Sequence, residues 1–381
     1  MKKDPPRSVH AFVQEREQDI FQTLKTICQI PSPTFHEREK IDHLKGILSS
    51  LGLTDVSIDA EGNAIGFLTH NPSDKRFVLV SAHADTACEA PLPIKVKDDG
   101  THLHAHGICD NTAGVTALLT FLHYVRREKM PLIRNYLIAF TVGEEGLGAK
   151  RGMKAVIKKF GRKITYVVNV ESHDIGRITN TCVGQERARL IVRTKQKGAH
   201  SWRNFGEPNA VVILSSIIRD LANLRLPPDT TFNVTAIRGG KSINAIPNEA
   251  ECLIEFRAKG QKHLDALSKK FQAILRAHRG SKISYSYDVL AMTKAAGMPK
   301  DHPMFGIAQK VQASLGIKPF FKLGNTDGDV SLAAGIPTIT LGASNGFATH
   351  SFEEKMEKQT YLLGVEQIIE ILLTLDREMN M

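Results

Sequence analysis

The sequence predicts an α/β protein in which a mostly parallel sheet domain is interrupted by an inserted α+β domain. Near both ends of the chain, apolar runs typical of strands buried on both faces alternate with amphipathic helical segments. Between these parts, a stretch of about 100 residues has the element order β-α-β-β-α-β instead. We therefore expect the sheet domain to consist of residues 1–186 and 291–381, with the inserted domain at residues 187–290.

The first part of the sheet domain begins with helices. An apolar stripe predicts a helix over residues 9–28, which Pro31 and Pro33 end. Thr34 followed by Glu37 has the pattern of a capping box, so a second helix is expected to run to about Leu51. Strands and helices then alternate, with strands at 56–59, 64–68, 77–82, 136–142 and 166–170, and helices at 111–127 and from about 149.

The inserted domain follows the ferredoxin-like order. Its expected elements are a strand at 187–193, a helix at 208–224, strands at 231–237 and 250–256, a helix at 262–279 and a strand at 283–288. The α/β pattern then returns, with a helix near 304–314, a strand at 338–341 and a long C-terminal helix.

Composition excludes several classes of protein. The chain has 381 residues, 42% of them hydrophobic and 24% charged, which is ordinary for a globular protein. Residues 1–6 are not followed by the apolar stretch of a secretory signal, and no apolar run is long enough for a membrane span. The net charge of +10 is spread along the chain without a basic, aromatic motif, so we expect no nucleic-acid partner. Five cysteines without a C-x-x-C pair favour reduced thiols and a cytoplasmic location.

Potential metal ligands follow the apolar runs. Open α/β sheets bind their ligands at the carboxyl ends of strands, and there the sequence places the following residues: His83 and Asp85, Asp110, Glu144 and Glu145, Glu171, and His350 near the C-terminus. Each piece alone is weak, because a second H-x-D triplet and a second E-E pair occur elsewhere in the chain. Their order along the chain gives them weight.

Imidazole and carboxylate ligands without thiolates suit zinc, manganese or cobalt. His83 is then a ligand whose second ring nitrogen is hydrogen-bonded to Asp85, and Asp110 bridges two metals. Glu144 and Glu145 repel each other unless a cation lies nearby, and one can bind metal while the other faces a water. The alternatives are a buried strand-end histidine for His83, a helix N-cap for Asp110 and a solvated pair of charges for the two glutamates.

These motifs resemble the co-catalytic dinuclear metallopeptidase family that includes peptidase T, carboxypeptidase G, aminoacylase, acetylornithine deacetylase and succinyl-diaminopimelate desuccinylase. The resemblance extends from about Ile30 to Glu354. It is carried by His83-Ala84-Asp85, Gly107-Ile108-Cys109-Asp110-Asn111, Gly143-Glu144-Glu145-Gly146, Gly198-Ala199-His200-Ser201, Ser242-Ile243-Asn244-Ala245 followed by Arg257, and Thr349-His350-Ser351. It implies a phosphorylase/hydrolase-like catalytic domain and an inserted lid domain that also dimerises.

The resemblance also implies a role for each residue. His83 and Glu171 complete one metal site, Glu145 and His350 the other, and Asp110 bridges both. Glu144 is the general base. The remaining roles belong to Asp85 beside His83, to His200 as an oxyanion ligand in its own or a partner subunit's site, and to Asn244, Arg257 and Asn325 as substrate-binding residues. A cis peptide bond is implied between Asp110 and Asn111.

The expected activity is hydrolysis of a peptide bond near a free terminus of a short peptide. It requires two divalent metal ions, zinc first, with cobalt or manganese also compatible. Within this family, the resemblance favours a peptidase T-like enzyme. The tripeptidase-like members carry a glycine pair where this chain has Lys322-Leu323-Gly324-Asn325, so the chain departs from them there. The alternatives are an N-acyl amino acid deacylase and a catalytically silent homologue that acts as a binding protein. A homodimer through the lid domain and a cytoplasmic enzyme without membrane contact are expected.

Overall fold

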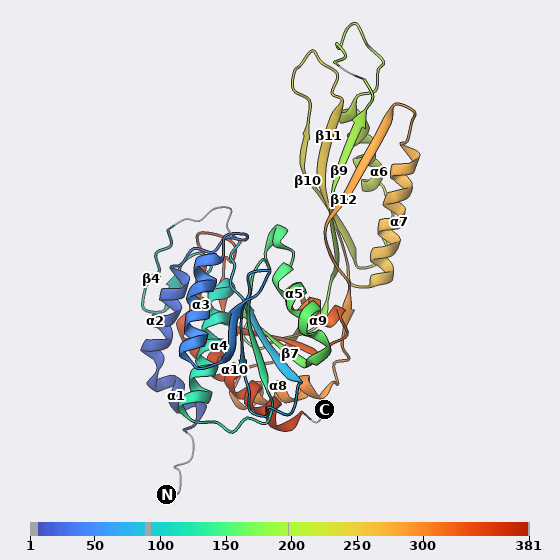
Figure 1. Ribbon diagram of the computed structural model, residues 1–381. Helices are drawn as coiled ribbons and strands as arrows, with labels where there is room; N and C mark the ends of the chain where they lie inside the picture. The colour runs from blue at the N-terminus through green and yellow to red at the C-terminus, as the bar shows by residue number, and fades with distance from the viewer. Residues whose placement is uncertain (1–6, 88–92, 197, 380–381) are drawn as a thin grey trace, which may run out of the picture. The chain divides into compact units, whose positions relative to one another are not determined.

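The computed structural model describes residues 7–87, 93–196 and 198–379 (Figure 1). Residues 1–6, on which the expectation that the chain has no secretory signal rests, lie outside the described residues. The chain forms two compact units, one made of Met1–Thr181 and Gly297–Met381, the other of Cys182–Ala296. Among the described residues, no helix combines the length and apolar character needed to cross a membrane.

The first unit is built on a large mixed sheet. Its strands lie in the order β1-β2-β6-β3-β7-β15-β8-β13, with β14 paired to β8. The four central strands β6, β3, β7 and β15 are parallel, so their carboxyl ends share one edge. The strands are β1 (Thr54–Ile58), β2 (Ala64–Leu68), β3 (Phe77–His83), β6 (Tyr136–Thr141), β7 (Ile164–His173), β8 (Arg177–Cys182), β13 (Ala296–Gly297), β14 (Phe320–Gly324) and β15 (Thr338–Ser344).

Helices cover both faces of this sheet, which explains the continuous apolar runs (Figure 1). One face packs against α1 (Val9–Glu15), α2 (Glu17–Cys28), α3 (Arg38–Ser50), α4 (Gly114–Arg127), α8 (Pro303–Ser314) and α10 (Lys358–Glu378). The other face packs against α5 (Arg151–Phe160) and α9 (Gly328–Ala333). Side chains along β3 alternate between the two cores, with Val78 and Val80 on one side and Leu79 on the other.

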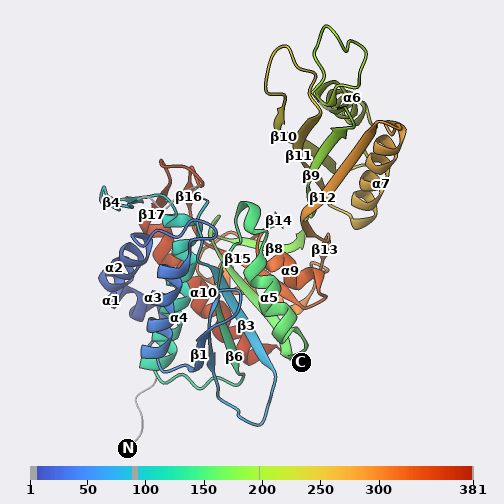
Figure 2. The ribbon, with the colours of Figure 1, turned by 45° about the horizontal axis from the view of Figure 1, so that its top comes forward.

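A small antiparallel sheet lies among the loops of the first unit (Figure 2). Its order is β16-β17-β5-β4, built from β4 (Lys97–Asp98), β5 (His102–His104), β16 (Gly346–Phe347) and β17 (Lys355–Glu357). These strands are two or three residues long, too short for a periodic pattern, and the sequence analysis did not predict them. The sheet joins the segment before Asp110 to the segment around His350.

The second unit has the expected ferredoxin-like order. Its antiparallel sheet runs β10-β11-β9-β12, and two helices share one core with its strands. The elements are β9 (Gly184–Thr194), α6 (Ala210–Ala222), β10 (Thr230–Gly239), β11 (Glu249–Ala258), α7 (Gln261–Ala277) and β12 (Ile283–Thr293). The predicted fold class, a mostly parallel sheet domain with an inserted α+β domain, is confirmed.

Two local expectations are wrong. The helix predicted over residues 9–28 is broken at Arg16, whose backbone is not helical, so that two helices form. Thr34 does not cap a helix, because its hydroxyl donates to the Asp85 carboxylate at 2.9 Å, and α3 starts only at Arg38. The capping-box pattern is local, whereas this hydrogen bond joins residues 51 positions apart.

Gly364 lets α10 lie directly on β15, and replacing it should destabilise the first unit. A Cβ atom there would stand 1.6 Å from the carbonyl oxygen of Ala343, which is backbone and has little room to move. We expect Gly364→Ala to lower the free energy of unfolding by about 3 kcal/mol, at the upper end of overpacking costs. Gly306→Ala in α8 is the matched control, because nothing lies within 4 Å of its Cβ position. It should raise stability by about 0.5–1 kcal/mol. Urea unfolding followed by circular dichroism measures both, and equal stability of the two variants would contradict this packing.

Candidate active site

The predicted metal ligands lie at the shared carboxyl edge of the central strands. His83 ends β3, Glu144 and Glu145 follow β6, and Glu171 lies near the end of β7. Asp110 comes from the turn at Ile108–Ala113, which leads into α4. The parallel register thus gathers side chains that are far apart in the sequence.

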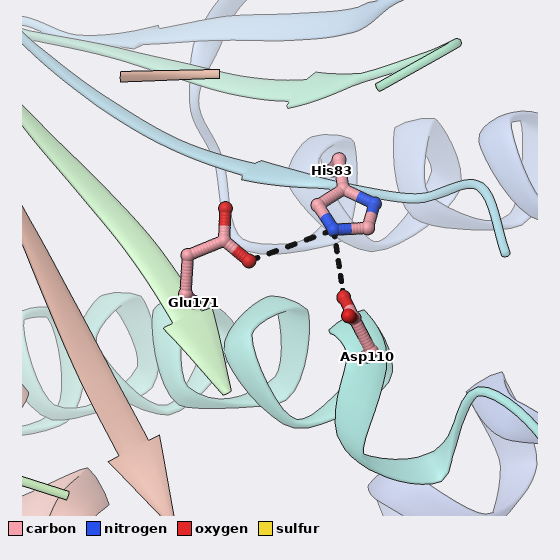
Figure 3. A group of neighbouring side chains, drawn as sticks. All are labelled: His83, Asp110 and Glu171. Atoms are coloured by element: carbon pink, nitrogen blue, oxygen red, sulfur yellow. Dashed lines mark hydrogen bonds and ion pairs between the residues drawn. The ribbon is translucent and has the colours of Figure 1, made fainter. Parts of the chain in front are cut away.

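Asp110 stands between two groups of side chains. Its Oδ1 lies 3.0 Å from Nε2 of His83, which is also 3.6 Å from Oε2 of Glu171 (Figure 3). Its Oδ2 lies 3.1 Å from Nε2 of His350, and that nitrogen is 3.0 Å from Oε1 of Glu145. Two three-residue sets therefore share one carboxylate, and His83 forms a third close set with Glu144 and Glu145.

The electrostatics of this cluster reflect several acids gathered in a small volume. Hydrogen bonds to Asp110 and Glu145 raise the pKa of His350 to about 11. Burial lowers the pKa of His83, but its hydrogen bonds to Asp110, Asp85 and Glu171 outweigh this and raise it well above its usual value. Burial raises the pKa of Glu144 well above the usual value, and the charge of Glu145 adds to this effect. In the metal-free site, the raised pKa values of the two histidines favour their protonated forms, whose positive charges partly balance the carboxylates.

Asp85 supports the site through the backbone. Its carboxylate accepts the amide N–H of Glu144 at 3.0 Å and that of Glu145 at 3.1 Å, besides the Thr34 hydroxyl. Nδ1 of His83 lies 3.1 Å from the Asp85 backbone carbonyl and 3.5 Å from its carboxylate. The carbonyl is therefore the closer partner, and it directs Nε2 of His83 toward Asp110.

Glu354 performs a similar task for Asp110, which the sequence analysis did not anticipate. Its buried carboxylate accepts the amide N–H groups of Gly107, Cys109 and Asp110 at 2.8–2.9 Å. Glu354 lies more than 240 residues from these amides, so no local pattern could have revealed the contact.

The turn that carries Asp110 is tightly enclosed. The peptide bond between Asp110 and Asn111 is cis, as the resemblance implied. The Asn111 side chain donates to the carbonyl of Val170 in β7 at 2.9 Å. A Cβ on Gly114 would come within 2.2 Å of the Asn111 amide, so the close approach requires glycine there. Asp110 is thereby tied to the strand that carries Glu171.

Asn325 lies at the same edge of the first unit. Its Oδ1 accepts from the buried Lys150 at 3.0 Å, and Lys150 is paired with Asp329 at 2.6 Å. The neighbouring Thr326 hydroxyl is 3.4 Å from the Asn169 amide, which in turn donates to Glu171 at 3.1 Å. Asn325 is thus connected to a candidate metal ligand through two side chains. Lys150 was not singled out from the sequence, although it follows the E-E pair closely.

The remaining predicted residues belong to the second unit and lie at opposite ends of it. His200 and Asn244 are exposed neighbours, because the amide of Ser201 donates to the carbonyl of Asn244 at 2.9 Å. Arg257 lies near the far end of β11, where it is paired with Glu255 at 2.7 Å. At ~3.3 Å per residue, β11 separates Arg257 from the His200 end by roughly 30 Å.

The donor set fits two divalent metal ions. It contains imidazole and carboxylate groups but no thiolate, and one carboxylate is placed to be shared between two ions. His83 and Glu171 would complete one site, and Glu145 and His350 the other. The side chain of Glu144 lies beside His83 of the first site and Glu145 of the second.

An α/β sheet with ligands at its strand ends, a shared carboxylate and an inserted α+β domain defines a class of dinuclear metal hydrolases. Residues 79–374 match the model of peptidase family M20/M25/M40, and the chain belongs to that family. The family's members are metal-dependent peptidases and related amidohydrolases, so the protein is an enzyme of this kind.

Similar proteins cover between 76% and 95% of this chain. The protein YqjE of Bacillus subtilis is 25% identical over 93% of this chain and 98% of its own length. The cytosol non-specific dipeptidase of Escherichia coli is 24% identical over 76% of this chain and 64% of its own. A tripeptidase from Staphylococcus aureus has a TM-score of 0.79 at 21% identity, covering 95% of this chain and 99% of its own. The aminopeptidase PepT from Bacillus cereus has a TM-score of 0.76 at 19% identity, covering 94% and 98%.

Metal binding should release protons from this site. At pH 7 the metal-free His350 and His83 are protonated, because both pKa values are raised, and a metal ligand must be neutral imidazole. We expect zinc binding at pH 7 to release at least about two protons per chain. Calorimetric titrations in buffers of different ionisation enthalpy measure this number.

His350→Ala should reduce the released protons by about one, since its own proton is removed with the ring. His43→Ala, at an exposed position of α3, is the matched control and should leave the number unchanged. Release of less than one proton by the unmodified protein would contradict the ion-paired site.

Proposed function

We propose that this protein is a cytoplasmic exopeptidase that hydrolyses short peptides near a free terminus, with two zinc ions and peptidase T-like specificity. The observation that carries the proposal is the carboxylate of Asp110, whose two oxygens face two complete sets of ligands with Glu144 beside them. The similarity of the fold to that of a tripeptidase and of an aminopeptidase supports the proposal that short peptides are the substrates.

Two divalent ions held by these ligands would polarise the scissile carbonyl and lower the pKa of the attacking water. Glu144 is placed to take the proton of that water and to deliver it to the leaving amine. Its side chain lies close to His83 and Glu145, one candidate ligand from each set. Asp85 holds the backbone of Glu144 and Glu145 so that the two side chains keep separate tasks.

His200, Asn244 and Arg257 act on the substrate in this proposal. His200 would bind the developing oxyanion, and Asn244 and Arg257 would bind the substrate's carboxylate or backbone. Residues roughly 30 Å apart on one domain cannot reach one small substrate together. We therefore propose a homodimer through the inserted domain, in which His200 and Asn244 serve the partner's site. The exposed Trp202 and Phe205 beside His200 favour such an association.

The roles of Glu144 and Asp110 can be separated by metal content and activity. Glu144→Gln should keep about two metal ions per chain but lose 10²–10⁴-fold in kcat, because it removes only the proton carrier. Asp110→Ala should lose both ions and activity, because the shared ligand is gone. Glu353→Gln, an exposed glutamate of the other E-E pair, is the matched control and should behave like the unmodified protein.

Elemental analysis gives the metal content. Tripeptides, dipeptides, N-acetyl amino acids and N-succinyl amino acids form the substrate panel. Faster cleavage of the acylated amino acids would replace the peptidase proposal by a deacylase. Failure of the unmodified protein to take up zinc, cobalt or manganese would favour a silent, binding homologue.

Complementation tests whether His200 acts in the partner's site. Glu144→Gln and His200→Ala should each be nearly inactive alone. After equal mixing and subunit exchange, half of the dimers are mixed, and one of their two sites has both residues intact. About a quarter of the unmodified activity should therefore return. No recovery although sedimentation velocity shows mixed dimers would mean that His200 serves its own chain's site, and a monomer would contradict the dimer.

A further inference from the structure

His173 has an unused nitrogen beside the candidate metal ligands. It is the last residue of β7, two positions after Glu171, so both side chains lie on the same face of that strand. Its Nδ1 is buried and has no hydrogen-bond partner among the described residues. A buried polar atom without a partner is rare enough to require an explanation.

Arg177 determines which nitrogen of His173 carries the hydrogen. The guanidinium is buried, donates to Oγ1 of Thr179 at 2.9 Å and lies 3.2 Å from Nε2 of His173. An arginine can only donate, so Nε2 must accept, and the hydrogen of the neutral ring then resides on Nδ1. The turn between β7 and β8 sets this pair, since the amide of Arg177 donates to the carbonyl of Asp174 at 3.0 Å.

The hydrogen on Nδ1 faces the shared carboxylate. Nδ1 of His173 lies 3.9 Å from Oδ2 of Asp110, the oxygen that also faces His350. This distance is longer than a hydrogen bond, so donation from Nδ1 requires the two atoms to come about 1 Å closer than they are here.

We propose that His173 is a positioning residue of the metal centre, which donates from Nδ1 to Asp110 and holds the shared carboxylate in its bridging orientation. Arg177 fixes the ring in the tautomer that can donate. The inference rests on the proposed function, because it gives Asp110 the role of a bridging ligand. Hydrogen bonds from residues that do not themselves bind the metal orient the metal ligands and strengthen metal binding.

Two variants of one residue separate the hydrogen bond from the bulk of the ring. In His173→Asn the amide nitrogen can occupy the position of Nδ1, whereas His173→Leu fills similar space without a donor. We expect His173→Leu to bind the more weakly held zinc ion 10–100-fold less tightly, and His173→Asn to stay close to the unmodified protein. His43→Leu is the matched control on an exposed surface. Competition with a chromophoric chelator measures the affinity.

The tautomer is tested independently of activity. In ¹⁵N NMR spectra of histidine-labelled protein, the signals missing from His173→Asn identify this ring, and its Nδ1 should be the protonated nitrogen. A proton on Nε2 would overturn the inference. So would equal zinc affinities of His173→Leu and the unmodified protein, or a raised KM with unchanged zinc affinity, which would assign the donor to the substrate.

Unfolding curves of both variants test whether the substitutions cause a general loss of structure. Such a loss would weaken metal binding in His173→Asn and His173→Leu alike, and that result would overturn the role of His173 as a hydrogen-bond donor to Asp110. Failure of the unmodified protein to bind zinc would remove the proposed function and this inference together. Normal binding by the unmodified protein and by His173→Leu removes only this inference.

Discussion

The site depends on one carboxylate that two groups of ligands share. Because the oxygens of Asp110 face His83 on one side and His350 on the other, a displacement of this side chain disturbs both groups at once. The fold fixes Asp110 from several directions. Glu354 holds the backbone amides before it, and Asn111 ties the turn to β7. The position of a single side chain is thus determined by segments from across the first unit.

The charges around Asp110 explain why this arrangement calls for cations. Asp85, Asp110, Glu144, Glu145 and Glu171 gather in one small region, where His83 and His350 are the histidines within hydrogen-bond distance of Asp110 among the described residues. Burying a carboxylate is costly unless a cation or several donors compensate it. In the absence of metal, the raised pKa values of His83 and His350 favour their protonated forms, and the raised pKa of Glu144 favours its neutral form. Two divalent ions would relieve this repulsion and return the histidines to their neutral state.

The sequence predicted those parts of the site that obey a simple spatial rule. Ligands at the ends of parallel strands must converge, so His83 and Glu171 could be placed together before the structure was known. The supporting contacts follow no such rule. Thr34 meets Asp85 across 51 positions, and Glu354 meets Gly107 across 247. These contacts exist only in the folded chain, and a local pattern such as the apparent capping box even points the wrong way.

Chemistry and specificity differ in how strongly the fold constrains them. The candidate metal ligands are mostly buried, and their neighbours leave few alternatives, so their residue types carry information about the reaction. His200 and Asn244 are exposed on loops of the second unit, where many side chains could be accommodated without loss of stability. Asn325 is exposed as well, although Lys150 holds its oxygen in place. The class of reaction can therefore be deduced from the buried residues, while the residues proposed to bind the substrate are ones that the fold leaves free to vary.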